Sequence, residues 1–282
     1  MQHIYLNHKL IPAQEALIPV TDRGFRFGDG VFETIRVHEG VPYRFEWHMA
    51  RLCTGLAAIS IDFDTKSLRI ECADIVRKNQ CSDGLLRIQI TRGTSGSGYL
   101  PAKAPATCVI ETLPLTPAPS ESISLYLSTY RRTPAACLPV HAKLAQGINS
   151  TLARMEAETH SCFEALQLNI QGIIAECSSS NIFWRKNNTL YTPALDCGIL
   201  NGAIRAAIFF LYPQKIYEAH EVIEAVASAD AVCITNSSWL ALPVKHLSPN
   251  NFMWESTQMA EEFNHLLMND MRAYTKANRQ HW

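Results

Sequence analysis

The sequence lacks paired cysteines, long apolar runs and an excess of either charge. Its nine cysteines form no C-x-x-C pair, and its ten histidines form no H-x-x-x-H pair. Scattered cysteines in an odd number are typical of reduced thiols, so we expect neither a disulfide framework nor a structural metal. The 25 basic and 26 acidic residues give a formal net charge of −1. Because no basic block occurs, we expect no nucleic acid and no anionic membrane surface as a partner.

Signals for membrane insertion, secretion and nucleotide binding are also missing. The longest apolar stretch, Ala206–Tyr212, is far shorter than the roughly 20 residues that span a bilayer. Polar residues interrupt the first ten positions, which argues against a secretory signal, so we expect a soluble cytoplasmic protein. Gly28 and Gly30 are followed by Glu33 where a G-x-G-x-x-G loop needs its third glycine. A dinucleotide site is therefore not favoured.

The remaining pattern predicts a mixed α and β protein with a sizeable core, since 47% of the 282 residues are hydrophobic. Alternating and helical spacings of apolar residues predict the elements. Strands are expected over residues 4–6, 31–37, 41–45, 85–91, 107–113, 123–130, 165–169, 172–175, 181–184, 190–192 and 231–235. Helices are expected over residues 47–58, 67–76, 149–159, 203–211 (capped by Asn201) and about 257–277.

The stretch Thr116–Ser122 is rich in proline and serine and divides these elements. Such a stretch neither continues a strand ladder nor starts a helix readily. We predict that it links a small N-terminal α+β domain, residues 1–115, to a larger C-terminal domain, residues 123–282.

Four separated blocks combine glycine, charged and hydroxyl residues in a distinctive order. The blocks are Asp22–Arg36, His48–Leu52, Ala142–Leu144 and Glu176–Arg205. In this order they resemble the fold-type IV pyridoxal-phosphate family (class IV aminotransferases). That family includes branched-chain aminotransferases, D-amino-acid aminotransferases and 4-amino-4-deoxychorismate lyases. The resemblance implies a smaller N-terminal α/β domain, a larger β-barrel-like C-terminal domain with helices, and pyridoxal 5'-phosphate as the cofactor.

The resemblance assigns the chemistry of the cofactor to Lys143 and Glu176. Lys143 would hold the pyridoxal aldehyde covalently, and apolar neighbours would favour its neutral amine because burial disfavours the ammonium form. Glu176 would face the pyridine nitrogen and strengthen the ring as an electron sink. Taken alone, Lys143 would be read as a solvated lysine and Glu176 as a solvated carboxylate at a strand end.

Other residues are implied for the phosphate and the ring. Arg51 offers a bidentate guanidinium, and the alternative for it is a surface salt bridge. The turn before residue 203 opens a helix whose free N–H groups point at an anion. The cofactor-binding residues implied by the family are Arg51, Lys143, Glu176, Leu200, Gly202, Ala203, Ile204 and Ser237. For Ser237 and the neighbouring Ser238, an ordinary polar turn is the alternative, and Leu200 is equally natural as a core leucine.

The substrate pocket is expected on one face of a strand. Phe32, Thr34 and Arg36 alternate along the strand, so they share a face. The family also places substrate contacts at positions that correspond to Ser97, Tyr99 and Ser238. Gly28 and Gly30 are expected to serve backbone geometry.

The choice within the family favours the lyase. Arg92–Tyr99 resembles the R-G-x-x-x-x-G-Y segment of the lyases, and Thr34 matches a threonine proposed to assist proton transfer there. Gln146 departs from the asparagine usual in lyases and D-specific enzymes. We expect a homodimer that converts aminodeoxychorismate to pyruvate and 4-aminobenzoate, a step of folate biosynthesis. An aminotransferase for D-amino or branched-chain amino acids and a catalytically silent homologue are the alternatives.

Overall fold

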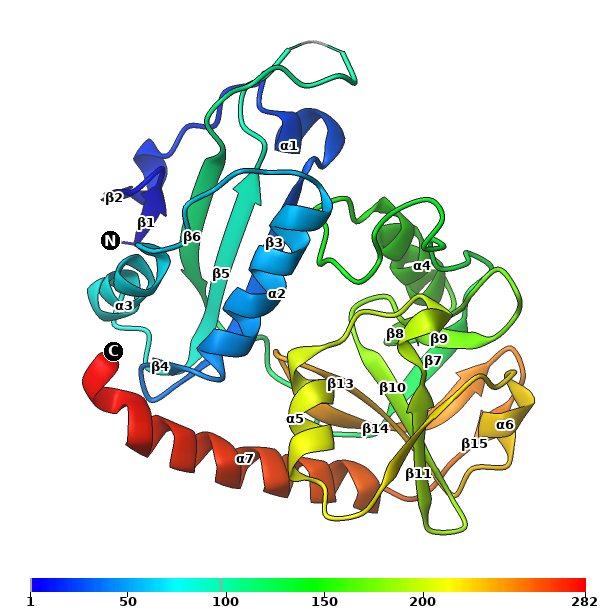
Figure 1. Cartoon of the computed structure of the whole chain (residues 1–282). Helices are drawn as coiled ribbons and strands as arrows, with labels where there is room; N and C mark the ends of the chain where they lie inside the picture. The colour runs from blue at the N-terminus through cyan, green and yellow to red at the C-terminus, as the bar shows by residue number, and fades with distance from the viewer. Residues whose placement is uncertain (1, 97) are drawn as a thin grey trace. The chain divides into compact units, whose positions relative to one another are not determined.

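A computed structural model describes residues 2–96 and 98–282, which form two compact units (Figure 1). The first unit comprises Met1–Leu115, Ala142–Gly147 and Met271–Trp282, and the second comprises Thr116–His141 and Ile148–Asp270. The chain passes from the first unit to the second at residue 116, and Thr116–Ser122 remains our proposed linker.

The first unit is built on a six-stranded sheet with the order β2-β1-β6-β5-β3-β4. Its strands are β1 (His3–Leu6), β2 (Lys9–Pro12), β3 (Gly30–His38), β4 (Val41–Pro42), β5 (Gly84–Thr91) and β6 (Thr107–Leu113). Helices α2 (Phe45–Ala58) and α3 (Leu68–Lys78) bury their apolar residues in one core with the inward residues of β3, β5 and β6. A short helix, α1 (Arg23–Phe27), precedes β3, and the 3₁₀ helix η1 (Ala13–Glu15) follows β2.

Along β3, buried and partly buried residues alternate from Val31 onward. Val31, Ile35 and Val37 are buried in the core, whereas Phe32 and Thr34 are only partly buried. The predicted common face of Phe32, Thr34 and Arg36 is therefore confirmed. The predicted strand over residues 41–45 is wrong at its end, because Arg44 adopts a left-handed conformation with φ 53° and Phe45 begins α2.

The second unit contains a nine-stranded sheet with the order β12-β11-β10-β13-β14-β7-β8-β9, and β15 pairs with β14. Its strands are β7 (Ile123–Leu127), β8 (Glu164–Leu168), β9 (Ile174–Cys177), β10 (Asn181–Lys186), β11 (Thr189–Pro193), β12 (Ile216–Ala219), β13 (Ala231–Asn236), β14 (Leu240–Ser248) and β15 (Phe252–Met253). The N–H of Ile174, at the start of β9, donates to the carbonyl of Glu221 just after β12 at 2.8 Å. Because β9 and β12 are the two ends of the strand order, the sheet curls on itself. The expected β-barrel-like domain is confirmed.

The helices of this unit are α4 (Ile148–Thr159), α5 (Ala203–Leu211), α6 (Glu224–Ala227) and, up to Asp270, α7 (Gln258–Asn278). The 3₁₀ helix η2 (Leu195–Cys197) precedes α5, and η3 (Arg279–His281) follows α7. The predicted helix over residues 203–211 is confirmed, but its N-cap is Gly202 rather than Asn201.

All nine cysteines are free thiols. Within residues 2–96 and 98–282, no helix has both the length and the apolar character needed to cross a membrane.

Candidate active site

The predicted site residues fall into two groups, one in each unit. Phe32, Thr34, Arg36, Arg51, Tyr99 and Lys143 belong to the first unit, whereas Glu176, Leu200, Gly202, Ala203, Ile204, Ser237 and Ser238 belong to the second. Ser97 lies outside the described residues. Each unit therefore holds its own part of the predicted chemistry.

The backbone around Lys143 pairs with the start of β3. The N–H of Phe32 donates to the Lys143 carbonyl at 3.0 Å, and the N–H of Ala145 donates to the Gly30 carbonyl at 2.8 Å. A β-bridge joins Leu144 to β3 between these two bonds. Two backbone hydrogen bonds therefore fix the main chain of Lys143 against the strand that presents the predicted substrate face.

Gly28 allows this segment to approach closely. Its φ of 67° lies in the left-handed region, and a Cβ there would stand 2.9 Å from the Cα of Gln146. A side chain at position 28 would therefore collide with the main chain three residues after Lys143. The expected backbone role of Gly28 has this physical cause.

The side chain of Lys143 contacts the predicted substrate face. Its Nζ lies 4.4 Å from the centroid of the Phe32 ring. Arg87 of β5, directly opposite Thr34 in the strand register, places its guanidinium carbon 4.5 Å from the same centroid. Residues that face each other in an antiparallel pair point to the same side of the sheet, so Arg87 and Arg36 share this face. Arg87 was not predicted from the sequence, although the polar positions of β5 alternate in the same way as those of β3.

Arg51 is held in place by a buried carboxylate that sequence reasoning also missed. Its Nε and one Nη donate to the two oxygens of Glu33 at 2.7 and 2.6 Å. Glu33 is fully buried and also bonds the Nδ1 of His48, three residues before Arg51 on α2, at 2.6 Å. The bidentate pair orients the guanidinium of Arg51, so its interpretation as a loose surface residue is not favoured.

The electrostatics of this cluster follow from burial and neighbouring charge. Burial alone would raise the pKa of Glu33, but the Arg51 hydrogen bonds and the nearby charges lower it from 4.5 to about 2. Burial lowers the pKa of His48 and, together with the charges of Arg51 and Lys143, outweighs the charge and hydrogen bond of Glu33, which raise it. At neutral pH, Glu33 is therefore ionised, and His48 is a neutral imidazole whose Nδ1–H donates to it.

In the second unit, three donors orient the carboxylate of Glu176. An Nη of Arg132 lies 2.6 Å from one oxygen, and the other oxygen accepts from the side chain of Asn181 at 2.9 Å and from the Leu200 N–H at 3.1 Å. Glu176 is 6% exposed. The carboxylate is thus buried and fixed rather than solvated at a strand end. Arg132 has no counterpart among the residues predicted from sequence, because its partner lies 44 positions later in the chain.

The side chain of Asn181 also fixes the main chain before α5 and leaves room only for glycine at position 202. The Asn181 amide also donates to the Leu200 carbonyl at 2.9 Å, and a Cβ on Gly202 would stand only 2.2 Å from its Oδ1. Only glycine fits at this position without moving Asn181. A glycine N-cap has no side chain to bond the N–H groups of Ala203 and Ile204, so these donors are suited to an anion.

The turn that contains Ser237 and Ser238 follows β13 and is ordered by Asn236. The Oδ1 of Asn236 accepts from the N–H of Ser238 at 2.9 Å, and both serines are partly buried. Thr235 pairs with Asn181 in the sheet, and its hydroxyl is buried without a hydrogen-bond partner in the part of the chain that the structure describes. An unpaired buried hydroxyl is costly unless a further group bonds it.

The loop before Tyr99 is anchored by Arg23. Its guanidinium donates to the carbonyls of Gly98 at 2.7 Å and Tyr99 at 3.1 Å, while its Nε donates to Asp29 at 2.8 Å. The ring of Tyr99 is 88% exposed and lies 5.7 Å from that of Phe27. The substrate role of Tyr99 therefore stays a prediction.

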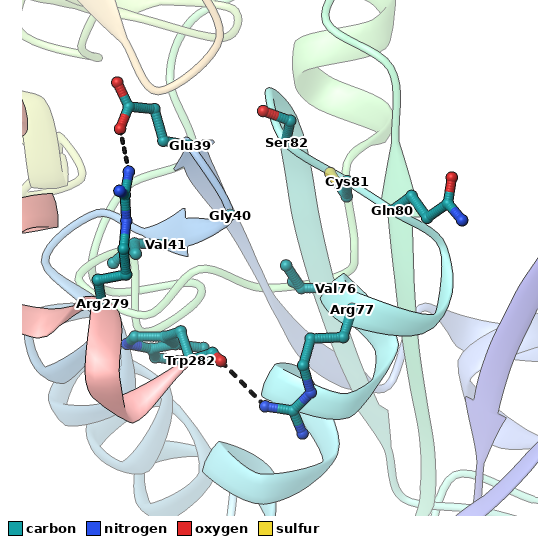
Figure 2. Close-up of a pocket in the computed structure, with 10 residues that line it drawn as sticks. All are labelled: Glu39, Gly40, Val41, Val76, Arg77, Gln80, Cys81, Ser82, Arg279 and Trp282. Atoms are coloured by element: carbon teal, nitrogen blue, oxygen red, sulfur yellow. Dashed lines mark hydrogen bonds and ion pairs between the residues drawn. The ribbon is translucent and has the colours of Figure 1, made fainter.

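A separate pocket of about 340 Å³ lies in the first unit (Figure 2). Two polar contacts join residues of its lining: Arg279 bonds Glu39, and Arg77 donates to the main-chain oxygen of Trp282 at 3.0 Å. Its described lining is Glu39, Gly40, Val41, Val76, Arg77, Gln80, Cys81, Ser82, Arg279 and Trp282. None of these belongs to the predicted site, so the pocket is a different place on the molecule.

The comparison with known families agrees with these arrangements. The family model described as Amino-transferase class IV matches residues 30–247. The chain therefore belongs to the class IV aminotransferase family, as its motifs predict.

Curated relatives include proteins with different names. The aminodeoxychorismate lyase of Bacillus subtilis is 30% identical over 259 residues, which are 88% of each chain. A putative branched-chain-amino-acid aminotransferase of Methanocaldococcus jannaschii is 32% identical over 248 residues, 86% of each chain. A D-alanine aminotransferase of Bacillus licheniformis is 29% identical over 252 residues, 86% of this chain and 87% of that one.

Solved structures show the same fold. The 4-amino-4-deoxychorismate lyase of Pseudomonas aeruginosa matches with a TM-score of 0.83 and 27% identity, covering 95% of this chain and 99% of that one. The T.th. branched-chain aminotransferase, complexed with N-(5'-phosphopyridoxyl)-L-glutamate, matches with a TM-score of 0.88 and 23% identity, covering 98% and 97%. The chain is a pyridoxal-phosphate enzyme of this family.

The residues present fit this cofactor. The glycine cap of α5 leaves donors for a phosphate, and the buried hydroxyl of Thr235 lacks a partner among the described residues. Glu176 is a buried, oriented carboxylate suited to a pyridine nitrogen, and Lys143 supplies an amine on a fixed backbone.

Proposed function

We propose that the protein is a 4-amino-4-deoxychorismate lyase that releases pyruvate and 4-aminobenzoate. The observation on which this rests is the face of β3 and β5 that presents Thr34, Arg36 and Arg87 beside the Phe32 ring that Lys143 contacts. A relative named aminodeoxychorismate lyase, similar over 88% of both chains, supports the same activity. The site residues named above are part of this proposal.

We assign proton transfer to Lys143 and Thr34. Pyridoxal phosphate, when bound, supplies an electron sink that makes the C–H bond beside the substrate amine acidic. Nζ of Lys143 removes this ring proton, and the hydroxyl of Thr34, two residues from Phe32 on the same face, assists the transfer. The backbone bonds of Lys143 to β3 keep the amine beside that face while its side chain moves.

We assign substrate binding to Arg36 and Arg87. Aminodeoxychorismate has two carboxylates, one on the ring and one on the enolpyruvyl group, and a guanidinium binds a carboxylate in bidentate geometry. Glu111 of β6 stands opposite Arg87 in the strand register, but among the described residues no carboxylate forms an ion pair with Arg87, whose side chain contacts Phe32 and Gln89 instead. Two cations on one face therefore match a substrate with two acidic groups.

Glu33 and Arg132 are positioning residues in this proposal. Glu33 orients Arg51 toward a phosphate through two hydrogen bonds, and Arg132 orients Glu176 toward the pyridine nitrogen. Each residue fixes a charged group without itself contacting the substrate.

An aminotransferase is the second candidate. The relative from Methanocaldococcus jannaschii, 32% identical over 86% of each chain, favours it. Arg36 and Arg87 would suit an acidic amino acid or its 2-oxo acid as well as the lyase substrate. The two activities share the cofactor residues, so only the reaction itself separates them.

The test is turnover of aminodeoxychorismate in the absence of any 2-oxo acid. The lyase needs no amino acceptor, because the amine leaves on 4-aminobenzoate. We expect many turnovers per active site, with pyruvate and 4-aminobenzoate formed in equal amounts. Lys143→Ala serves as the matched inactive control. Amino transfer from D-alanine or leucine to 2-oxoglutarate, with 4-aminobenzoate no higher than in that control, would contradict the lyase and favour the aminotransferase.

We further propose that the protein acts as a homodimer with its site near the subunit interface. Tyr99 and Leu100, adjacent in the first unit, are each 88% exposed, and Phe25 of the same unit is 75% exposed. A second copy that covers these side chains would bury them and bring Tyr99 to the site of the partner subunit, with its loop in the present conformation. Light scattering after size-exclusion chromatography should give twice the chain mass. A monomer mass at micromolar concentration would contradict this proposal.

A further inference from the structure

Three side chains with different metal-binding atoms meet on the second unit. Asp196, Cys197 and His220 offer a carboxylate oxygen, a sulfur and an imidazole nitrogen that all lie within 4.8 Å of one another. The Nε2 of His220 is 2.6 Å from the carboxylate of Asp196. None of them belongs to the predicted site, and no spacing motif joins them, because His220 lies 23 positions after Cys197.

The sheet brings the three residues together by its topology. β11 and β12 are parallel neighbours, with Pro193 paired to Ala219, so the carboxyl ends of both strands lie at the same end of the sheet. The N–H of Ala194 donates to the Ala219 carbonyl at 3.1 Å, and the Cys197 thiol donates to the same oxygen at 3.7 Å. The backbone of the cluster is therefore fixed by the fold, and only side-chain adjustments would be needed to surround an ion.

The geometry points to a zinc site formed by Asp196, Cys197 and His220, and we propose that the protein binds one Zn²⁺ there. Zinc accepts cysteine sulfur, histidine nitrogen and carboxylate oxygen in tetrahedral geometry, whereas magnesium and calcium require oxygen ligands. The side chains of Asp196 and His220 are 74% and 58% exposed, so the fourth position is open to water. This proposal replaces the expectation of no metal.

A metal at this position would connect the cluster to the candidate active site through the main chain. Cys197 is followed by Gly198, which has φ 88°, and the segment continues to Leu200, whose N–H donates to Glu176. Zinc would tie the beginning of this segment to the end of β12. Bound zinc would therefore stabilise the segment whose Leu200 N–H orients Glu176.

The experiment measures zinc binding to the cofactor-loaded protein by competition with a chromogenic chelator. We expect one Zn²⁺ per chain. Asp196→Asn, Cys197→Ser and His220→Gln should each weaken binding by at least about tenfold, since even partners outside the ligand shell cost 10–100-fold. The control is His246→Gln, a histidine bonded only weakly to Asn251 at 3.5 Å, which should leave the affinity unchanged.

Two further measurements keep the proposal open to refutation. X-ray absorption at the zinc edge should show one sulfur at about 2.3 Å. Because Cys197 is buried and its variant can misfold, the exposed residues Asp196 and His220 decide the result. A Cys53→Ser, Cys137→Ser variant removes the two exposed thiols and should still bind. Zinc without a sulfur ligand, binding lost with those two thiols, or equal affinity in His220→Gln and the wild type would overturn the proposal.

Discussion

At Glu33, burial raises the pKa and the neighbouring charges lower it, and replacement by glutamine tests this balance. Glu33→Gln keeps the shape of the side chain but removes the charge that Arg51 and His48 contact. The pKa of Glu33 falls from 4.5 to about 2 in the folded protein. That difference corresponds to about 3 kcal/mol of stability at neutral pH. Removal of one partner of a buried pair is expected to cost a similar amount, about 3–5 kcal/mol.

The dependence on pH has a definite sign. A carboxylate whose pKa is lowered by folding contributes stability that is fully present above its pKa in the unfolded state, here 4.5. This contribution is lost as the pH falls through its pKa in the folded state, about 2. The difference in unfolding free energy between wild type and Glu33→Gln should therefore shrink by about 2 kcal/mol between pH 7 and pH 3.

Chemical denaturation of the cofactor-free protein at several pH values measures this difference. The matched control is Asp64→Asn, whose carboxylate pairs with Lys66 at 3.7 Å on the surface and is 70% exposed. That exposed pair should contribute less than about 1 kcal/mol. A cost for Glu33→Gln that is as small as the control, or that is the same at pH 7 and pH 3, would refute the electrostatic argument.

Three predictions concern the site itself. Borohydride treatment followed by peptide mapping should fix the cofactor on Lys143, and a label on another lysine would refute the assignment. Arg51→Ala should weaken cofactor affinity roughly ten- to over a hundredfold by fluorescence titration, because a charge-assisted contact contributes about 1.5–3 kcal/mol; unchanged affinity would contradict a phosphate role. Thr34→Val should lower kcat about 100-fold or more with KM and folding unchanged, since proton transfer typically contributes that much, whereas an unaffected kcat would leave Thr34 with a packing role.

The sequence predicted those parts of the fold that depend on local pattern. The alternation of β3 is visible in the residues themselves, and so is the helical spacing of α2. By contrast, β12 escaped prediction because Tyr217 and Glu218 in its middle are exposed, which leaves no apolar alternation to detect. The N-cap of α5 was misplaced by one residue because Gly202 takes the extended conformation directly before Ala203, and the side chain of Asn201 accepts from Arg205 instead.

A candidate site could be proposed from the sequence where the family motif covers it, but the residues that orient it across long sequence separations could not. Lys143, Glu176 and Gly202 stand in the matching blocks. Arg132 lies outside them, and only the fold brings it to Glu176. The burial of Glu33 was predictable from the sequence, because it occupies an inward position between two core residues of β3. A buried carboxylate requires a cationic partner, which Arg51 provides.

The short pairing of Ala142–Gly147 with β3 has a consequence for how the chain can be divided. The first unit is assembled from three separate stretches of the chain, and the middle one is only six residues long. If residues 1–115 were expressed alone, the Gly30 carbonyl and the Phe32 N–H would lose their partners, and β3 would present an unpaired edge near its start. Such edges promote association between molecules. The fragment should therefore aggregate, and a peptide covering residues 142–147 should reduce the aggregation only in part, because the fragment also lacks Met271–Trp282, whose Trp282 packs against the same core.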